Sequence, residues 1–415
     1  MKRNFSLILA LSAIVLTAGC KKSAAPSSID LARNAKAGFV TNADWQQPGI
    51  TGRVVRFDVD DGNGSDCLLA YDVGTNEVSL TQVNGTNSTT LFTSAGFWCD
   101  NHVMINVNLY LGDVTDNYNE VGGFHVIPFD ADGTGHDDHV LIYAPGRGVA
   151  YLLSYDGGGY WHECWSSTSG IGGYDLHGPT DKIIAYDYGS GYKNALICYR
   201  PGYQFFWVLQ DGISPGSPAQ TVPNFTAAVK SNGGVGGFDL KGSQDQIVAI
   251  PTTNSPGNMQ IVCYRPGPTL GFVWWETHSA YSTGWSPVEE SRSGLNGNSF
   301  QALGDRMIAV NLSTSGATGY NWDTYMFGYR PGYGLGYSFN YQWVPSLGFV
   351  ETWNLFGGLN YPMNHLPYSP NTYEGDHVVA FSPQGKGNTS LLFYGNGTST
   401  QSQIYEWNSG YTQVY

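Results

Sequence analysis

Short apolar runs recur along the chain in a repeated order of hydrophobic and polar positions. Each repeat begins with a run that reads Asp-x-apolar-apolar-Ala-apolar in its best copies, such as Asp181–Tyr186 and Asp245–Ile250. Runs this short and this rich in β-branched residues predict strands that are covered on both faces. The other copies are Asp305–Val310 and Asp376–Phe381, with looser versions at Arg53–Phe57 and Phe124–Phe129.

A Tyr-x-x-Gly turn follows the second apolar run of each repeat. Proline precedes the glycine in several copies, which suits a tight reversal of the chain. A third run with a central aromatic residue and a weaker fourth run complete the unit, so each repeat predicts a four-stranded sheet. The turns begin at Tyr71, Tyr143, Tyr199, Tyr264, Tyr329 and Tyr394, of which the last four are 65 residues apart.

Repetition at this period predicts an array of small sheets, because one such unit cannot bury its own apolar face. The sequence therefore predicts an all-β protein with a single β-propeller of six four-stranded blades over residues 38–415. Gly96–Val121 departs from the repeat and is either an outer strand with a long loop or an inserted flap; as a complete blade it would make the count seven. Gly38–Thr41 could close the ring as an outer strand of the last blade.

The first residues have the composition of an export signal. Lys2 and Arg3 precede an apolar run, and the small residues Thr17-Ala18-Gly19 precede Cys20. This segment resembles the lipobox of bacterial lipoproteins, which implies removal of residues 1–19 and acylation of Cys20. Residues 20–37 are polar and predict a flexible tether. Because Lys21 follows the cysteine, the resemblance implies the cell envelope, with the outer membrane as the expected location; an ordinary cleaved signal is the alternative.

Charge and cysteine content narrow the possible partners. The net charge of the chain is −14, and residues 1–36 contribute +5, so residues 37–415 have a net charge of −19. A body this acidic repels nucleic acid and anionic lipid. Five cysteines remain besides Cys20, an odd number without metal-type spacing. Cys198 and Cys263 precede Tyr at the same place in adjacent repeats and are expected to be small core residues rather than disulfide partners.

One loop has the spacing of a calcium site. Asp130–Asp138 places oxygen-bearing side chains at alternate positions, and its glycines allow a tight curl. The predicted ligands are Asp130, Asp132, Thr134, Asp138 and the backbone carbonyl of His136. A weaker second loop offers Asp58, Asp60 and Asp66. The alternative for both loops is an Asx-rich hairpin turn without metal.

These residues carry a resemblance to known repeats. The Phe-Asp-x-Asp-Gly-Thr-Gly-x-x-Asp element is similar to the loop of FG-GAP or VCBS-type propeller repeats. Gly170–Leu176 and its copy Gly234–Leu240 resemble a tandem module of secreted bacterial propellers, including lectin-like ones. The resemblance implies a β-propeller and no certain activity, since propellers serve in binding, catalysis and scaffolding.

Motifs for catalysis are weak. The sequence has no phosphate-binding loop and no Gly-rich dinucleotide motif. A glycosidase needs two carboxylates several ångströms apart. The available glutamates are expected on third strands or just after them, and we interpret them as solvated edge residues: Glu163, Glu276, Glu351 and Glu406.

Aromatic residues are abundant, with 12 Trp and 28 Tyr, and they suit both blade packing and sugar recognition. The irregular clusters supply the ligand-binding candidates Trp161, Trp165, Trp274 and Trp275. We expect an exported, lipid-anchored binding module, with a glycan or an envelope component as its partner. The alternatives are a polysaccharide hydrolase or lyase, and a structural or protein-interaction propeller.

Overall fold

The computed structural model describes most of the repeat region. The described residues are 39–40, 52–59, 66–84, 87–99, 104–107, 124–134, 136–157, 159–186, 195–211, 223–250, 258–267, 271–279, 284–292, 294–295, 299–311, 324–331, 335–344, 348–356, 376–382, 390–395, 403–407 and 411–413. The predicted signal and tether, including Cys20, lie outside them. In the described part of the chain no helix is long and apolar enough to cross a membrane.

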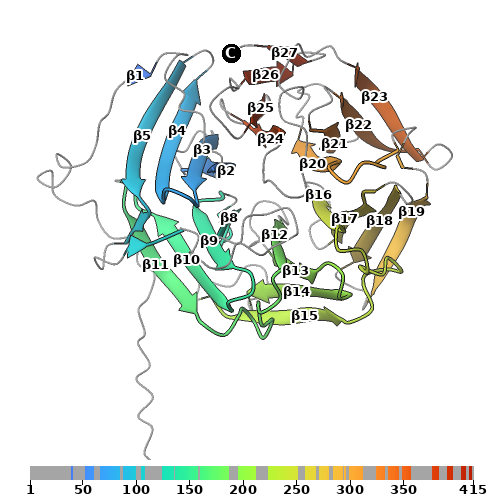
Figure 1. Ribbon diagram of the computed structural model, residues 1–415, viewed down its shortest axis with the longest axis horizontal. Coiled ribbons are helices and arrows are strands. Elements are labelled where there is room, and N and C mark those ends of the chain that lie inside the picture. Colours follow the sequence, from blue (N-terminus) through green and yellow to red (C-terminus); the bar gives the residue numbers. More distant parts are fainter. Residues whose placement is uncertain are drawn as a thin grey trace, which may run out of the picture.

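Six antiparallel sheets surround one axis and are called blades 1 to 6 (Figure 1). From the axis outward, blade 1 contains β2 (Gly52–Asp58), β3 (Asp66–Asp72), β4 (Glu77–Asn84), β5 (Asn87–Ala95) and β1 (Phe39–Val40). Blade 2 contains β8 (His125–Phe129), β9 (His139–Ala144), β10 (Val149–Tyr155) and β11 (Trp161–Ser167). Blade 3 contains β12 (Lys182–Tyr186), β13 (Ala195–Arg200), β14 (Phe205–Asp211) and β15 (Phe225–Ser231).

The second half of the ring repeats this order. Blade 4 contains β16 (Gln246–Ile250), β17 (Asn258–Arg265), β18 (Phe272–Ser279) and β19 (Trp285–Ser291). Blade 5 contains β20 (Arg306–Asn311), β21 (Thr324–Arg330), β22 (Leu335–Val344) and β23 (Gly348–Phe356). Blade 6 contains β24 (Asp376–Phe381), β25 (Ser390–Gly395), β26 (Gln403–Trp407) and β27 (Tyr411–Gln413).

The innermost strands form a closed ring. Each contacts the next in the order β2, β8, β12, β16, β20 and β24, and β24 contacts β2 again. The predicted fold class is therefore confirmed: the protein is an all-β propeller of small antiparallel sheets. The described part of Gly96–Val121 forms a two-stranded ribbon of β6 (Phe97–Trp98) and β7 (Met104–Ile105), and residues 100–103 and 108–121 lie outside the described residues.

The ring does not close through Gly38–Thr41 as predicted, because the described part of this segment does not join the last blade. Within that segment, β1 pairs with β5 on the outside of blade 1 and not with blade 6. Blade 6 is instead built from its own four strands and joins blade 1 by backbone contacts. The N–H of Asp66 donates to the carbonyl of Ser382 (2.8 Å), and the N–H of Ser382 donates to the Asp66 carboxylate (2.6 Å).

The tyrosines of the Tyr-x-x-Gly turns join each blade to the next. The hydroxyl of Tyr143, for example, accepts a hydrogen bond from the backbone N–H of Ile183 in the inner strand of blade 3 (3.0 Å). Equivalent bonds are Val126 to Tyr71, Ile247 to Tyr199, Met307 to Tyr264, Val378 to Tyr329 and Val54 to Tyr394. The last bond closes the ring, because Val54 is in blade 1 and Tyr394 is in blade 6. A motif that looks like turn chemistry in the sequence is therefore a repeated contact between blades.

The loop Gly170–Leu176 adds a second contact between blades. The N–H of Gly170 donates to the carbonyl of Gly148 in blade 2 (2.7 Å), and the N–H of Gly148 donates to the carbonyl of Leu176 (3.1 Å). Gly170 has a φ of +86°, and a Cβ there would lie 1.9 Å from the carbonyl oxygen of Tyr174, so only glycine fits. Gly234–Leu240 repeats the arrangement against the turn of blade 3.

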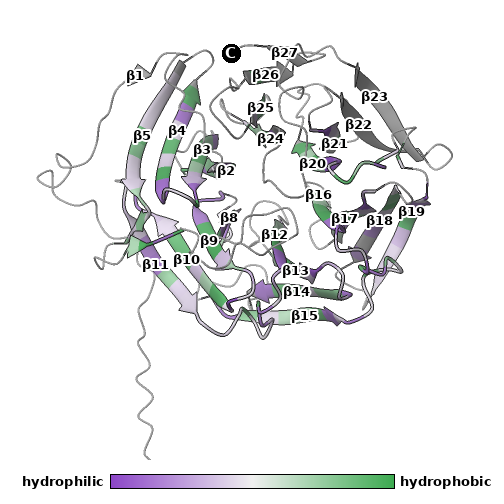
Figure 2. Cartoon of the chain, viewed as in Figure 1, coloured by the Kyte–Doolittle hydropathy of each residue, from purple (hydrophilic) through white to green (hydrophobic). Residues whose placement is uncertain are grey.

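Apolar side chains pack between consecutive blades. Figure 2 shows hydrophobic positions along strands such as β10 and β16. Burial of Cys198 and Cys263 without a disulfide confirms their interpretation as small core residues. The buried cysteines of this interior are Cys67, Cys99, Cys164, Cys198 and Cys263. Burial of this kind is the main source of stability, since each blade leaves an apolar face that its neighbour covers.

Candidate functional site

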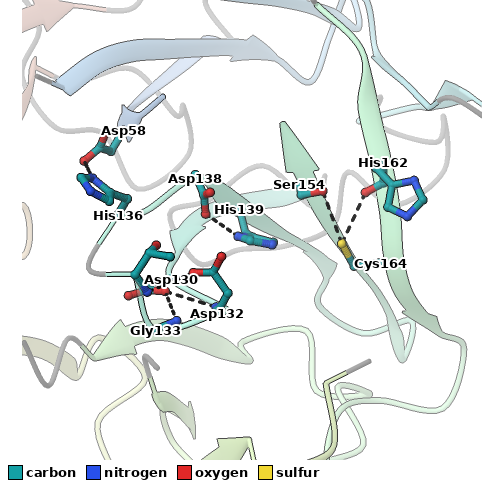
Figure 3. A network of polar contacts seen from close by, with 11 residues as sticks. Asp58, Asp130, Asp132, Gly133, His136, Asp138, His139, Ser154, His162 and Cys164 are labelled. Atoms are coloured by element: carbon teal, nitrogen blue, oxygen red, sulfur yellow. Dashed lines mark hydrogen bonds and ion pairs between the residues drawn. The ribbon is translucent and has the colours of Figure 1, made fainter. Parts of the chain in front are cut away.

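The loop between β8 and β9 curls around its own aspartates (Figure 3). The buried Asp130 carboxylate accepts hydrogen bonds from the backbone N–H groups of Asp132 (3.2 Å) and Gly133 (2.6 Å). Asp132 in turn accepts from the N–H of Thr134 (3.0 Å). Gly133 has a φ of +82°, which permits the tight curl. This part of the loop therefore consists of two successive Asx turns.

The other end of the loop is tied to the inner strand of blade 1. Nδ1 of His136 lies 2.7 Å from Oδ2 of Asp58. The guanidinium of Arg56 lies 2.6 Å from Asp137 and forms an ion pair with it. Acidic and basic side chains from blades 1 and 2 therefore meet between the blades.

A carboxylate, an imidazole and a thiol follow at the start of β9. Nδ1 of His139 lies 2.5 Å from Oδ1 of Asp138. Burial lowers the pKa of His139, but the hydrogen bonds and charges of Asp138 and Cys164 outweigh it and raise that pKa to about 10. The Cys164 thiol also donates to the hydroxyl of Ser154 (3.5 Å). His139 thus supplies positive charge beside the acidic loop.

Two carboxylates of the predicted calcium loops, one in blade 2 and one in blade 1, have pKa values shifted in opposite directions. Burial raises the pKa of Asp132, but hydrogen bonds from Thr134 and the charge of His139 bring it below its ordinary value. Burial raises the pKa of Asp66, and the neighbouring charge of Arg56 opposes that effect only in part. An ionised Asp132 suits a cation, whereas Asp66 is less readily ionised.

Several of the predicted calcium ligands contact groups of the protein itself. Among the described residues no group of three or more His, Cys, Asp or Glu side chains is arranged to hold a metal ion. Asp130 faces backbone N–H groups, and Asp138 faces His139. In the weaker loop, Asp58 faces His136, Asp66 faces Ser382, and Asp60 lies outside the described residues. Calcium on either loop stays a prediction.

The four predicted ligand-binding tryptophans do not form one site. Trp161 and Trp275 are fully buried, so neither can present a ring face to a ligand at the surface, and the sequence interpretation does not fit them. Trp161 packs against Phe57 and Phe97. Trp165 and Trp274 are half-buried, on β11 and β18 of different blades.

The interpretation of Glu276 as a solvated edge residue is wrong. Glu276 is 0% exposed, and neither carboxylate oxygen has a hydrogen-bond partner among the described residues. A Cβ on Gly236 would lie 1.8 Å from its Oε2, so the carboxyl packs directly on that backbone. Burial, with a smaller contribution from the charge of Glu290, raises the pKa of Glu276 to about 8. Glu163 is half-buried on β11, and the side chains of Glu351 and Glu406 lie outside the described residues.

In blades 3, 4 and 5, the Asp just before the inner strand is held by an arginine at the end of the second strand. In blade 3, the guanidinium of Arg200 contacts both carboxylate oxygens of Asp181 (2.6 and 2.8 Å) and one oxygen of Asp175. Arg265 binds Asp245 and Asp239 in the same way in blade 4, and Arg330 binds Asp305 in blade 5. Sequence reasoning missed these pairs, although Asp and Arg recur at corresponding places of the three repeats, 19, 20 and 25 residues apart.

One large ring is well exposed in the turn next to such a pair. Tyr203 is 59% exposed, and its backbone N–H donates to the carbonyl of Arg200 (3.2 Å). The carboxylate of Asp175, bound to Arg200, is also exposed. The β13–β14 turn therefore presents an exposed aromatic ring three residues after an arginine that binds an exposed carboxylate.

Comparison with known proteins gives only distant likenesses. The sequence matches no protein-family model and no curated protein, so the FG-GAP or VCBS resemblance stays an expectation. Among solved structures, it is similar to an α-L-arabinanase from Penicillium chrysogenum in complex with arabinobiose, at 10% identity and a TM-score of 0.40 over 92% of this chain and 99% of that one. A triple mutant of AofleA from Arthrobotrys oligospora shares 11% identity with a TM-score of 0.38 over 70% and 73%.

An oligogalacturonate lyase in complex with manganese gives a TM-score of 0.31 at 10% identity, over 88% of this chain and 96% of that one. Because all three scores are below 0.5, these likenesses say nothing about the activity of this protein. Its class rests on its own strand order and closed inner ring, which define a β-propeller.

Proposed function

We propose that the protein is an exported, lipid-anchored β-propeller that binds carbohydrate. The observation that carries this proposal is Tyr203, a 59% exposed ring in the turn that also contains the Arg200 end of an ion pair. Carbohydrate sites use a flat ring against the apolar face of a sugar, with nearby polar groups that bond its hydroxyls. The export signal and the acylation of Cys20 belong to the proposal and place the protein in the bacterial cell envelope.

A glycan array with the full chain tests carbohydrate binding, with titration of the best ligand to follow. We expect saturable binding without turnover. Tyr203→Ala should weaken it by several-fold to about tenfold, whereas Tyr203→Phe, which keeps the ring, should bind almost as the wild type does.

Three outcomes contradict parts of the proposal. Equal binding by Tyr203→Ala and the wild type would remove the site from this turn. Release of reducing ends from a polysaccharide would favour a hydrolase or lyase. Failure to bind any glycan, with recovery of a defined envelope protein in a pull-down, would favour a protein-interaction propeller.

A further inference from the structure

Six side chains occupy one level around the propeller axis. Each is on the inner strand of its blade, directly opposite the Tyr whose hydroxyl reaches the next blade. Lys182, for example, pairs with Tyr199, and Arg306 pairs with Tyr329. The six residues, called the axial ring below, are Arg53, His125, Lys182, Gln246, Arg306 and His377.

The inner strands that contain these residues, β2, β8, β12, β16, β20 and β24, surround the axis in Figure 1. All six residues are partly exposed, whereas the residue after each of them is buried. Nζ of Lys182 donates to Oε1 of Gln246 in the next blade (3.1 Å), so these two neighbouring members contact each other. His125 and His377 each stack on the Tyr opposite, with ring centroids 5.0 Å apart. The same backbone register thus brings the six side chains to one level.

The axial ring contains positively charged side chains, whereas the chain as a whole has a net negative charge. The sequence has 33 acidic residues and only 19 Lys and Arg, yet the same register position holds Arg53, Lys182 and Arg306 together with two histidines. Three of the four aspartates that directly precede members of the ring are paired with arginines, and the side chain of the fourth, Asp376, lies outside the described residues. Asp181, Asp245 and Asp305 are buried and bound to the arginines of the second strands.

We propose that the axial ring binds an anionic ligand through its oxygen atoms, as a carboxylate or a phosphate group would be bound. Convergence of like charges costs free energy that an anion offsets. Guanidinium and ammonium groups form the strongest hydrogen bonds with such oxygens, and the amide of Gln246 adds a further donor. This site is separate from the proposed Tyr203 site and does not depend on carbohydrate binding.

Calorimetric titration of the full chain with inorganic phosphate, D-glucuronate and D-glucose tests the proposal. We expect phosphate, glucuronate or both to bind with an affinity that falls as salt is added, and glucose not to bind. Binding of glucuronate alone would identify a sugar acid as the ligand type. Binding of phosphate alone would identify a phosphate ester. A lack of binding by both anions, or equal binding by glucose, would overturn the proposal.

Variants locate the site. Lys182→Met and Arg306→Gln should each weaken anion binding about tenfold or more, because each removes a charged hydrogen-bond donor. Lys230→Met removes the same charge from β15, where Lys230 lies over the ring of Trp207, and should leave affinity unchanged. Gln246→Lys adds a cation and should tighten binding, which keeps the test informative if the first variants fold poorly. Unchanged affinity in all three ring variants would overturn the proposal.

Discussion

At the scale of single residues, the environment of Glu276 differs most clearly from the one expected from the sequence, because its carboxyl is fully buried. Glu276 pairs with Ile261, which is four residues before Arg265. The corresponding pair in blade 3 is Leu209 with Leu196, four residues before Arg200, so Leu209 has the position of Glu276 there. A leucine there packs without cost, whereas a carboxyl without a partner is costly when ionised and less so when protonated. We therefore expect the stability of the junction between blades 3 and 4 to depend on pH through Glu276.

We predict that the free energy of unfolding falls as pH rises from about 4.5 to about 8 because of Glu276. Its pKa is about 8 in the folded protein, against an ordinary 4.5, so the folded state holds the proton more tightly. The protonated group costs little below the ordinary value, and the penalty is complete above the folded value. Glu276→Gln should remove this dependence, and Glu276→Leu should stabilise the protein at pH 8 by on the order of 3 kcal/mol. Denaturant titrations at pH 5 and pH 8 measure both effects.

Leu209→Glu is the matched test in blade 3. It should introduce a similar pH dependence there, because Leu209 is buried and packs against Gly172 as Glu276 packs against Gly236. If Glu276→Gln keeps the pH profile of the wild type, the carboxyl is solvated or paired in solution and the prediction is wrong.

At the scale of elements, hydrogen bonds connect blades whose sheets share no strand. They come from the hydroxyls of the Tyr-x-x-Gly turns and from the loops Gly170–Leu176 and Gly234–Leu240. We predict that Tyr143→Phe lowers the free energy of unfolding by about 1–2 kcal/mol, because the buried N–H of Ile183 loses its acceptor. Urea unfolding monitored by circular dichroism measures the loss. The control is Tyr203→Phe, which removes a hydroxyl from an exposed ring and should change stability by less than about 0.5 kcal/mol. Equal effects of the two variants would show that the Tyr143 bond adds nothing.

The loop Asp130–Asp138 gives a second prediction at this scale. Calcium should raise the melting temperature by about 2–4 °C, because an ion bound only by the folded state stabilises it. Asp130→Ala should abolish most of that rise. Asp72→Ala is the control, since Asp72 also accepts backbone N–H bonds in a turn, from Gly74 and Thr75, and no ion is predicted there. Identical melting curves in calcium and in chelator would make the loop an Asx-rich turn without metal.

At the scale of the whole molecule, the ring closes on itself through β2 and β24, and the predicted lipid is a separate attachment. We predict that Cys20→Ala moves the protein from the detergent phase to the aqueous phase in phase partitioning, because no acyl chain can then be attached. Lys21→Ala keeps the cysteine and should partition as the wild type does. Unchanged partitioning of Cys20→Ala would show that the anchor is absent or lies elsewhere.

Local sequence was enough to predict the strands, the turns and the repeated small sheets. Apolar runs such as Lys182–Tyr186 and the Pro-Gly turn after Arg200 follow from backbone preferences that act over a few residues. The six repeated sheets and the propeller class followed from them. The burial of Cys198 and Cys263 was also predictable, because both precede Tyr at the same place in adjacent repeats.

Tertiary structure alone decided which groups meet across blades. The partners of the Tyr hydroxyls, the burial of Glu276 and the levels of Arg53 and His377 depend on how one sheet packs on the next. Strand periodicity says which side a residue faces, but it does not say what lies on that side. Members of the axial ring are dozens of residues apart in sequence, and only closure of the propeller brings their charges together.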